Sequence, residues 1–177
     1  MDRSNHYEQA FEAFLRQRRM CYIAVDESKR SLLDEGSVKS LDFIVYGGEE
    51  SRFLIDVKGR RFPGGKADKP RKVWQNWATL EDIEGLERWG RRFGSGYTGL
   101  IVFVYGIEPT VQLAADTDDL FEWHGGQYLL RAVPVDVYRA VMRPRSAKWR
   151  TVHLSVPVFR DVARPFTAFA QSAACLL

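Results

Sequence analysis

Cysteine is scarce in this sequence: the 177 residues include only two, Cys21 and Cys175. Neither has a second cysteine or a histidine close by at the spacing of a zinc site. Two cysteines this far apart do not make the dense framework of a small secreted domain either. The sequence therefore indicates neither a disulfide framework nor a zinc site, and it predicts a cytoplasmic protein.

Long apolar runs are also missing. No stretch approaches the roughly 20 apolar residues that span a bilayer, and the first six residues, Met-Asp-Arg-Ser-Asn-His, are too polar for a signal peptide. We expect neither export nor membrane insertion. The three histidines are scattered, and no Ser/His/Asp, Walker or Rossmann spacing is present.

Apolar residues are nevertheless plentiful enough for one core. Hydrophobic residues make up 45% and aromatic residues 13% of the chain, and no repeat or long linker divides it. We predict a single domain over residues 1–177, with a core over about 5–105 and a C-terminal elaboration over about 106–177.

The first half of the chain contains alternating helix and strand patterns. Apolar spacing predicts a helix from Asn5 to about Arg18, begun by an Asn5/Glu8 capping box. β-Branched and aromatic residues predict strands over 20–25, 40–46 and 52–57. The glycine-containing turn at 47–51 predicts that the last two strands pair antiparallel.

The pattern continues with residues 59–73, whose glycines, prolines and cations predict an exposed, mobile loop. A second helix is expected from Thr79 to about Phe93, followed by a fully buried strand over 100–105. The fold class is therefore α/β, with a core of order α-β-β-β-α-β and a mixed sheet flanked by helices.

The C-terminal part adds further predicted elements. Strands are expected over 111–114 and 127–135, and a short helix over 135–142. The apolar residues Phe166, Phe169, Leu176 and Leu177 would either cover the core or form an interface with a second copy of the chain.

Two carboxylates fall where the predicted hairpin strands meet. The two-residue period of a strand places Asp56 and Lys58 on one face. Asp42 is the only charge in an apolar strand, where a carboxylate without compensation is costly. A divalent metal bound between Asp42 and Asp56 would compensate this buried charge. Carboxylate oxygens are ligands that suit magnesium.

This arrangement resembles the D…(D/E)-x-K signature of the PD-(D/E)XK, or restriction-endonuclease-like, nucleases. The resemblance implies that Asp42 and Asp56 bind magnesium, or manganese in its place, with the Val57 carbonyl as third ligand. It also implies that Lys58 positions the attacking water and that Glu8 holds a metal-bound water. Leu41 departs from the family's frequent proline, and Asp56 is the shorter of the two permitted acids. Residues 6–12 separately resemble an uncharacterised bacterial group named for its HYExAFE signature.

Simpler explanations stay open for these residues. An acid and a lysine two apart on a strand often form a structural ion pair, and Glu8 could serve only the capping box of the first helix. Between Glu8 and Glu12 we prefer Glu8, because it lies beside the apolar stripe of the helix.

A basic stretch follows the proposed catalytic lysine directly. A charge run is usually a solvated loop, but here it would meet a phosphate backbone. Two tryptophans and an asparagine precede the second helix and could grip bases. The predicted nucleic-acid-binding residues are Arg60, Arg61, Lys66, Lys69, Arg71, Lys72, Trp74, Asn76 and Trp77.

The sequence thus predicts a magnesium-dependent nuclease that hydrolyses phosphodiester bonds in DNA. One alternative is a nucleic-acid-binding module of the same fold without catalysis. Another is a protein-interaction domain in which Asp42, Asp56 and Lys58 only satisfy one another.

Overall fold

A computed structural model describes residues 6–25, 32–33, 36–37, 41–48, 51–66 and 68–170. None of the helices in these ranges is long and apolar enough to cross a membrane. The elements in chain order are α1 (His6–Gln17), β1 (Cys21–Ala24), β2 (Leu32–Leu33), β3 (Gly36–Ser37), β4 (Phe43–Tyr46), β5 (Arg52–Phe62), β6 (Gly64–Lys66), β7 (Lys69–Arg71), β8 (Ala78–Thr79), α2 (Leu80–Phe93), β9 (Tyr97–Ile107), β10 (Leu120–Trp123), β11 (Gly126–Pro134), α3 (Val135–Val141), β12 (Arg143–Ser146), β13 (Thr151–His153), α4 (Val156–Val162) and η1 (Phe166–Ala168).

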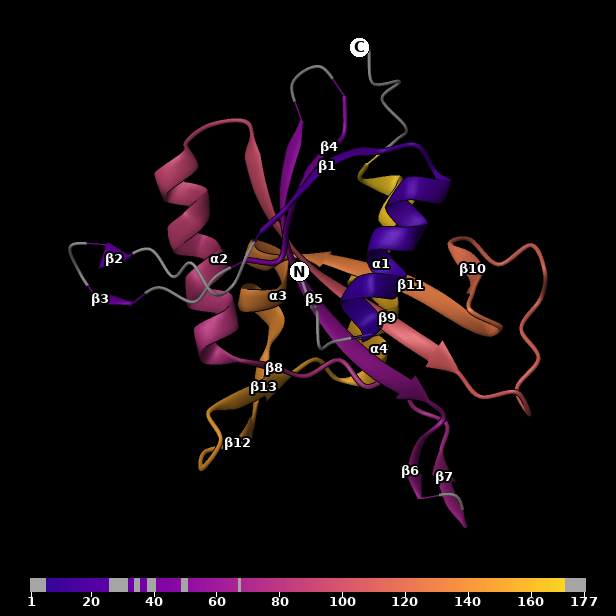
Figure 1. Ribbon diagram of the computed structural model, residues 1–177. Coiled ribbons are helices and arrows are strands. Elements are labelled where there is room, and N and C mark those ends of the chain that lie inside the picture. The colour runs from indigo at the N-terminus through magenta and orange to yellow at the C-terminus, as the bar shows by residue number, and fades with distance from the viewer. Residues whose placement is uncertain are drawn as a thin grey trace.

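A six-stranded mixed sheet forms the centre of the molecule, in the order β1-β4-β5-β9-β11-β10 (Figure 1). Strands β5 and β9 run parallel from the Arg52–Tyr97 pair to the Phe62–Ile107 pair. The other neighbouring strands in the sheet pair antiparallel, including β4 with β5 as predicted. The four strands β1, β4, β5 and β9 of this sheet, together with the helices α1 and α2, follow one another in the predicted order α-β-β-β-α-β.

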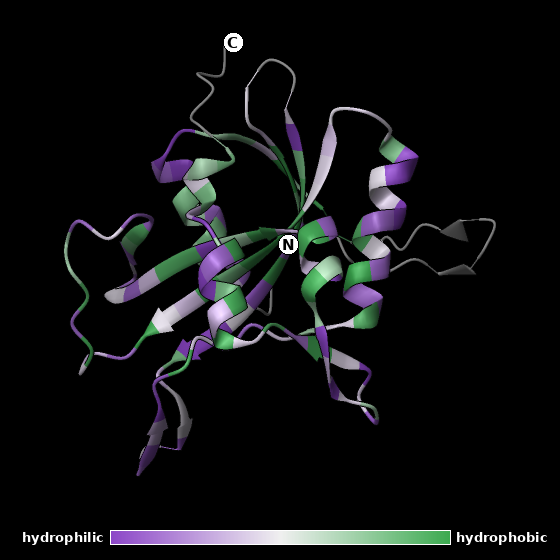
Figure 2. Cartoon of the chain, turned by 180° about the vertical axis from the view of Figure 1, so that it is seen from behind, coloured by the Kyte–Doolittle hydropathy of each residue, from purple (hydrophilic) through white to green (hydrophobic). Residues whose placement is uncertain are grey.

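Helices cover both faces of the sheet. On one face, α1 buries Ala10, Phe11, Phe14 and Leu15 against β4, β5 and β9. On the other face, α2, α3 and α4 pack around residues such as Ile83, Tyr138 and Phe159. Apolar residues dominate the central strands, whereas α2 alternates between polar and apolar bands (Figure 2). This division fixes which strand residues can meet α1 and which can meet α2.

Phe166 settles part of the question about the apolar C-terminus. Its fully buried ring packs edge-on against Phe11 of α1, with ring centroids 5.2 Å apart. Phe166 therefore covers the core. Leu176 and Leu177 lie outside the described residues.

The prediction of a loop over residues 59–73 is wrong. Strand β5 continues to Phe62 because β9 pairs with it along its whole length, and Phe62 is buried with its ring stacked 3.7 Å from that of Trp74. Strands β6 and β7 then form a hairpin that projects beyond the sheet (Figure 1). The cations thus stand on an ordered strand pair.

The prediction of a strand over 111–114 is also wrong. Those residues lie in an irregular segment between two turns, where Val111 N donates to the Glu108 carbonyl, and they pair with none of the described strands. Strand β10 pairs with β11 instead and buries Phe121. Residues 111–114 thus have no neighbouring strand, among those described, with which to form a sheet.

Cys21 corrects the expectation drawn from the cysteine count. This residue is disulfide-bonded, although the spacing in sequence did not indicate it. The chain's other cysteine, Cys175, lies outside the described residues, as does Asn5 of the predicted capping box. Sequence separation is a poor guide to pairing, because disulfide formation depends on distance in the fold.

Candidate active site

The β4–β5 hairpin brings Asp42 and Asp56 together. The backbone N–H of Asp42 donates to the Ile55 carbonyl over 2.8 Å, which fixes Asp42 beside the strand that carries Asp56. Both carboxylates are buried. The backbone N–H of Val57 donates to Asp42 Oδ2 over 2.6 Å, so the Asp42 side chain is tied to the residue between Asp56 and Lys58.

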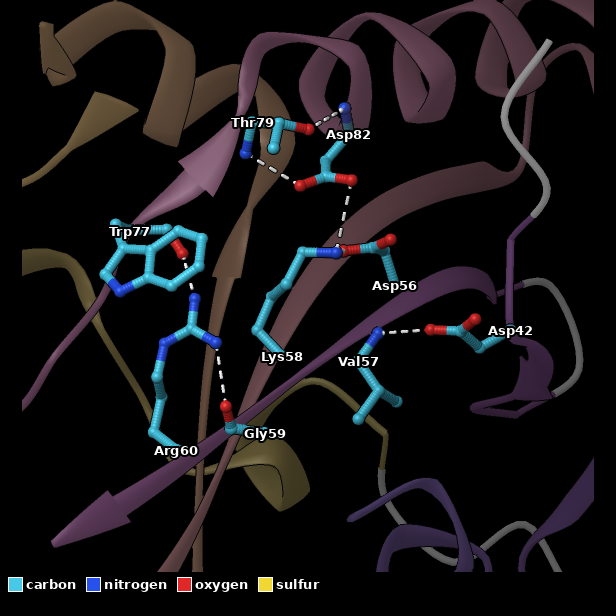
Figure 3. Close-up of polar contacts among 9 residues, drawn as sticks. All are labelled: Asp42, Asp56, Val57, Lys58, Gly59, Arg60, Trp77, Thr79 and Asp82. Carbon is cyan, nitrogen blue, oxygen red and sulfur yellow. Dashed lines mark hydrogen bonds and ion pairs between the residues drawn. The ribbon is translucent and has the colours of Figure 1, made fainter. Parts of the chain in front are cut away.

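Lys58 lies on the same face of β5 as Asp56, as the strand period predicts. Its Nζ is 2.5 Å from Asp56 Oδ2 and 3.2 Å from Asp82 Oδ1. The Lys58 side chain is only 13% exposed. Figure 3 shows its ammonium group directed at both carboxylates, while Asp42 points towards Val57.

Asp82 is the site residue that the sequence prediction missed. It is the third residue of α2, where its Oδ2 accepts from the Thr79 N–H over 2.7 Å and its own N–H donates to Thr79 Oγ1 over 3.1 Å. The predicted helix start at Thr79 is confirmed, and an acid at this position of a capping box is explained by the helix alone. No local pattern in the sequence places Asp82 beside Lys58, because this contact depends on how α2 packs on β5.

The charges around Lys58 keep it protonated. Burial alone would lower the pKa of Lys58, but the carboxylates of Asp56 and Asp82 raise it above its ordinary value. At neutral pH this residue is therefore an ammonium ion. It can donate hydrogen bonds and stabilise negative charge, but it cannot accept a proton from water.

The pKa of the Asp42 carboxyl group is raised. Burial raises the pKa of Asp42 well above its ordinary value, and the negative charges of Asp56 and Glu8 raise it further. The Val57 N–H and the Lys58 charge act against this rise. A carboxylate with a raised pKa accepts a proton more readily than an ordinary one.

Glu8 lies on α1, which packs closely on β5. A Cβ atom at Gly59 would overlap the ring of Tyr7, so only glycine allows this contact. Glu8 is half-buried and contributes to the field at Asp42. Glu12, one turn later, instead accepts from Tyr22 Oη over 2.8 Å and pairs with Arg16 at 3.0 Å.

The donor set at Asp42 and Asp56 fits a hard divalent cation. Asp42 and Asp56 are both buried, and the charge of Asp56 raises the pKa of Asp42, so a cation would offset the negative charge gathered there. The described residues contain no cluster of three or more His, Cys, Asp or Glu side chains placed to hold a metal. Magnesium does not need one, because it is usually held by one or two carboxylates together with water and substrate phosphate.

The predicted basic residues fall into two groups. Lys66, Lys69, Arg71 and Lys72 are exposed on or next to the β6–β7 hairpin, and Arg61 is exposed but pairs with Glu108 at 2.8 Å. Arg60 instead uses its guanidinium internally, donating to the Trp77 and Gly59 carbonyls. Burial lowers the pKa of Arg60. The hairpin cations are thus the ones open to a polyanion.

Trp74 and Trp77 are half-buried, whereas Asn76 is buried. Trp74 stacks on Phe62. Asn76 is buried, and its Oδ1 accepts from the Leu154 N–H over 2.9 Å. Trp77 has the Arg60 guanidinium 3.9 Å and the Arg145 guanidinium 5.1 Å from its ring centroid.

No family model and no curated protein matches this sequence. The resemblance of residues 6–12 to the HYExAFE group therefore gains no support. Among solved structures, the fold is similar to that of Hjc, a Holliday junction resolvase from the archaeal hyperthermophile Archaeoglobus fulgidus, with a TM-score of 0.53 and 12% sequence identity over 95% of each chain. The chain thus has a restriction-endonuclease-like fold, as predicted.

Proposed function

We propose that this chain is a metal-dependent nuclease that hydrolyses phosphodiester bonds in DNA. The observation that carries the proposal is the contact set at the end of the β4–β5 hairpin. There Asp42, Asp56 and Lys58 converge, with Asp42 bonded to the Val57 N–H and Lys58 paired with Asp56. The fold shared with a Holliday junction resolvase supports the same substrate class.

Magnesium, or manganese in its place, would be held by Asp42, Asp56 and the Val57 carbonyl, with Glu8 acting through a water. When bound, the metal would neutralise charge on the phosphate and lower the pKa of the attacking water. The remaining steps fall to the chain's own residues.

Lys58 would orient the attacking water and stabilise the negative charge that develops on the phosphoryl oxygens. Its protonated state at neutral pH suits this role, because an ammonium group can only donate. Asp42 is assigned to the metal in this proposal, so the proton that the water loses would pass to bulk solvent. Water would add to phosphorus, and the bond to the ester oxygen of the leaving strand would break.

Cleavage of labelled DNA tests this proposal directly. Single-stranded, duplex and branched substrates would be incubated with magnesium, manganese or a chelator. The natural chain would be compared with Asp56→Asn and Lys58→Arg, each first checked for folding by circular dichroism. Metal-dependent cutting that both substitutions abolish is the expected result, and cutting that survives Asp56→Asn would refute the assignment.

A second candidate function has an observation of its own. Lys58 is shared between Asp56 and Asp82, which is also the contact set of a structural ion-pair cluster. In that case the chain is a module of the same fold that binds DNA or protein without cutting. Binding of DNA by the natural chain with no cleavage under either metal would favour this candidate.

A further inference from the structure

A pocket of about 300 Å³ lies between the segment that precedes α2 and the C-terminal strands. The residues that matter for its chemistry are Arg71, Trp74, Trp77, Arg145, His153 and Val156. Its lining combines cationic and aromatic side chains and includes no described aspartate or glutamate. This combination suits a ligand that carries negative charge and an aromatic ring.

Hydrogen bonds join the two sides of the pocket. Asn76 accepts from the Leu154 N–H over 2.9 Å, and Tyr138 Oη donates to the Asn76 carbonyl over 2.7 Å. These bonds join the segment before α2 to the strand β13 and to α3. A preformed pocket loses less entropy on binding than one that must be ordered by its ligand.

Arg145 is the cation best placed to contact a ligand there. It is exposed, its guanidinium lies over the Trp77 ring, and it makes no hydrogen bond or salt bridge with any residue that the structure describes. An arginine resting on an aromatic ring is already oriented, and its planar donors match a phosphate group. Its hydrogen-bonding capacity is therefore available for an anion.

Trp77 also connects this pocket to the candidate active site. Arg60, which shares a strand face with Lys58, stacks on Trp77 and donates to its carbonyl. Thr79, which follows Trp77 closely in the sequence, caps α2. Asp82 of the same helix pairs with Lys58. Figure 3 shows Trp77 and Arg60 beside Lys58 and Asp82.

We propose that this pocket binds one nucleotide unit of the DNA strand next to the bond that is cut. Arg145, Arg71 and His153 contact its phosphate, and Trp74, Trp77 and Val156 form the wall for its sugar and base. The proposal rests on the nuclease function proposed above and adds a substrate-positioning site to it. It also gives Asn76 a role in shaping the site.

Titration with mononucleotide tests the pocket independently of cleavage. Tryptophan fluorescence would be followed as dTMP, thymidine or inorganic phosphate is added to the natural chain, to Arg145→Gln and to Arg91→Gln. Arg91 is an exposed arginine of α2 outside the pocket, so its variant controls for net charge. We expect dTMP to bind more tightly than thymidine or phosphate, and Arg145→Gln alone to weaken it about five- to tenfold.

The effect on DNA should agree with the titration. Arg145→Gln should raise KM for single-stranded DNA by a similar factor and leave kcat unchanged. It should also reduce the slope of log Kd against log salt by about 0.7, the value for one lost phosphate contact on a single strand. His153→Gln gives a second, independent variant if Arg145→Gln is poorly folded.

The outcomes separate this inference from the function it rests on. Equal effects of Arg145→Gln and Arg91→Gln, or phosphate binding as tight as that of dTMP, would overturn the nucleotide pocket even if DNA is cut. Loss of dTMP binding in Arg145→Gln would support the pocket even if no cleavage is found, in which case only the nuclease proposal fails.

Discussion

Asp82 and Lys58 form a 3.2 Å ion pair that joins the first turn of α2 to the motif strand β5. The Asp82 side chain is 2% exposed, and its other oxygen is bonded to the Thr79 N–H. One carboxylate thus caps a helix and holds the proposed catalytic ammonium group. Lys58 is positioned from both sides, by Asp56 on its own strand and by Asp82 on the helix.

The variant Asp82→Asn should separate the capping of α2 from the ion pair with Lys58. The asparagine can still accept from the Thr79 N–H, but it removes the charge that faces Lys58. We expect a loss of about 1–3 kcal/mol in the free energy of unfolding, because the buried ammonium keeps only one carboxylate partner. The pKa of Lys58 should fall, since Asp82 helps to raise it, and the alkaline limb of the cleavage profile should move to lower pH.

Thr79→Ala is the matched control for that variant. It removes the cap hydroxyl, at a cost of about 1 kcal/mol, but leaves Asp82 beside Lys58. Thermal melts should show both variants destabilised, whereas only Asp82→Asn should shift the pH profile. A shift of the same size in Thr79→Ala would mean that Asp82 acts through the helix alone.

Lys58→Met should destabilise the fold as well as abolish cleavage. It leaves Asp56 and Asp82 buried and facing one another without the ammonium group between them, and removing one partner of a buried pair costs about 3–5 kcal/mol. Urea unfolding of Lys58→Met, Asp82→Asn and the double variant measures the coupling. We expect the double variant to recover part of the stability lost in Lys58→Met; strictly additive losses would show that the pair is not coupled.

Asp42→Asn should stabilise the protein at neutral pH and inactivate it. Burial raises the pKa of Asp42 in the folded state, so the folded chain holds that proton more tightly than the unfolded chain. Stability is therefore lost as pH rises from the unfolded pKa to the raised folded pKa, and the loss is complete above it. Asparagine carries no such charge and can still accept from the Val57 N–H.

The pH dependence of melting gives the check on Asp42. The melting temperature of Asp42→Asn should match that of the natural chain in acid and exceed it at pH 7 by about 2–4 °C, the response of a chain of this size to ~1 kcal/mol. A variant that melts below the natural chain at pH 7 would show that the Asp42 charge stabilises the fold. Magnesium should raise the melting temperature of the natural chain alone, since only it keeps both carboxylates.

The sequence predicted those parts of the site that depend on local periodicity. The two-residue period of a strand placed Asp56 and Lys58 on one face, and the start of α2 at Thr79 was also predicted. The approach of Asp82 to Lys58 could not be predicted, because it depends on how α2 docks on β5 after an intervening hairpin. The same holds for Phe62 and Trp74, whose stacking extends β5 into a segment that looked like a loop. Contacts between elements are set by packing, which the spacing of residues within one element does not contain.

Mutation should divide the predicted nucleic-acid-binding residues into two groups. Buried residues should affect stability, and exposed residues should affect DNA binding. Asn76→Ala leaves the buried Leu154 N–H without its acceptor and should cost about 1–3 kcal/mol of stability. Lys66→Gln, Lys69→Gln and Lys72→Gln change exposed side chains of the hairpin region and should leave the melting temperature unchanged. Each should instead reduce the salt slope of duplex binding by about 0.9 if it contacts a phosphate.

Anisotropy titrations of a labelled duplex at several salt concentrations would measure these slopes, with Arg91→Gln as the charge control. The hairpin projects beyond the sheet from the end of the strand that carries Lys58 (Figure 1), so a duplex whose phosphate lies at Lys58 would pass over it. Slopes that respond to the hairpin variants but not to Arg91→Gln would place the DNA along β5 and its hairpin. Slopes that respond equally to all four variants would mean that the duplex is held by net charge alone, and the basic hairpin would then be only a solvated extension of β5.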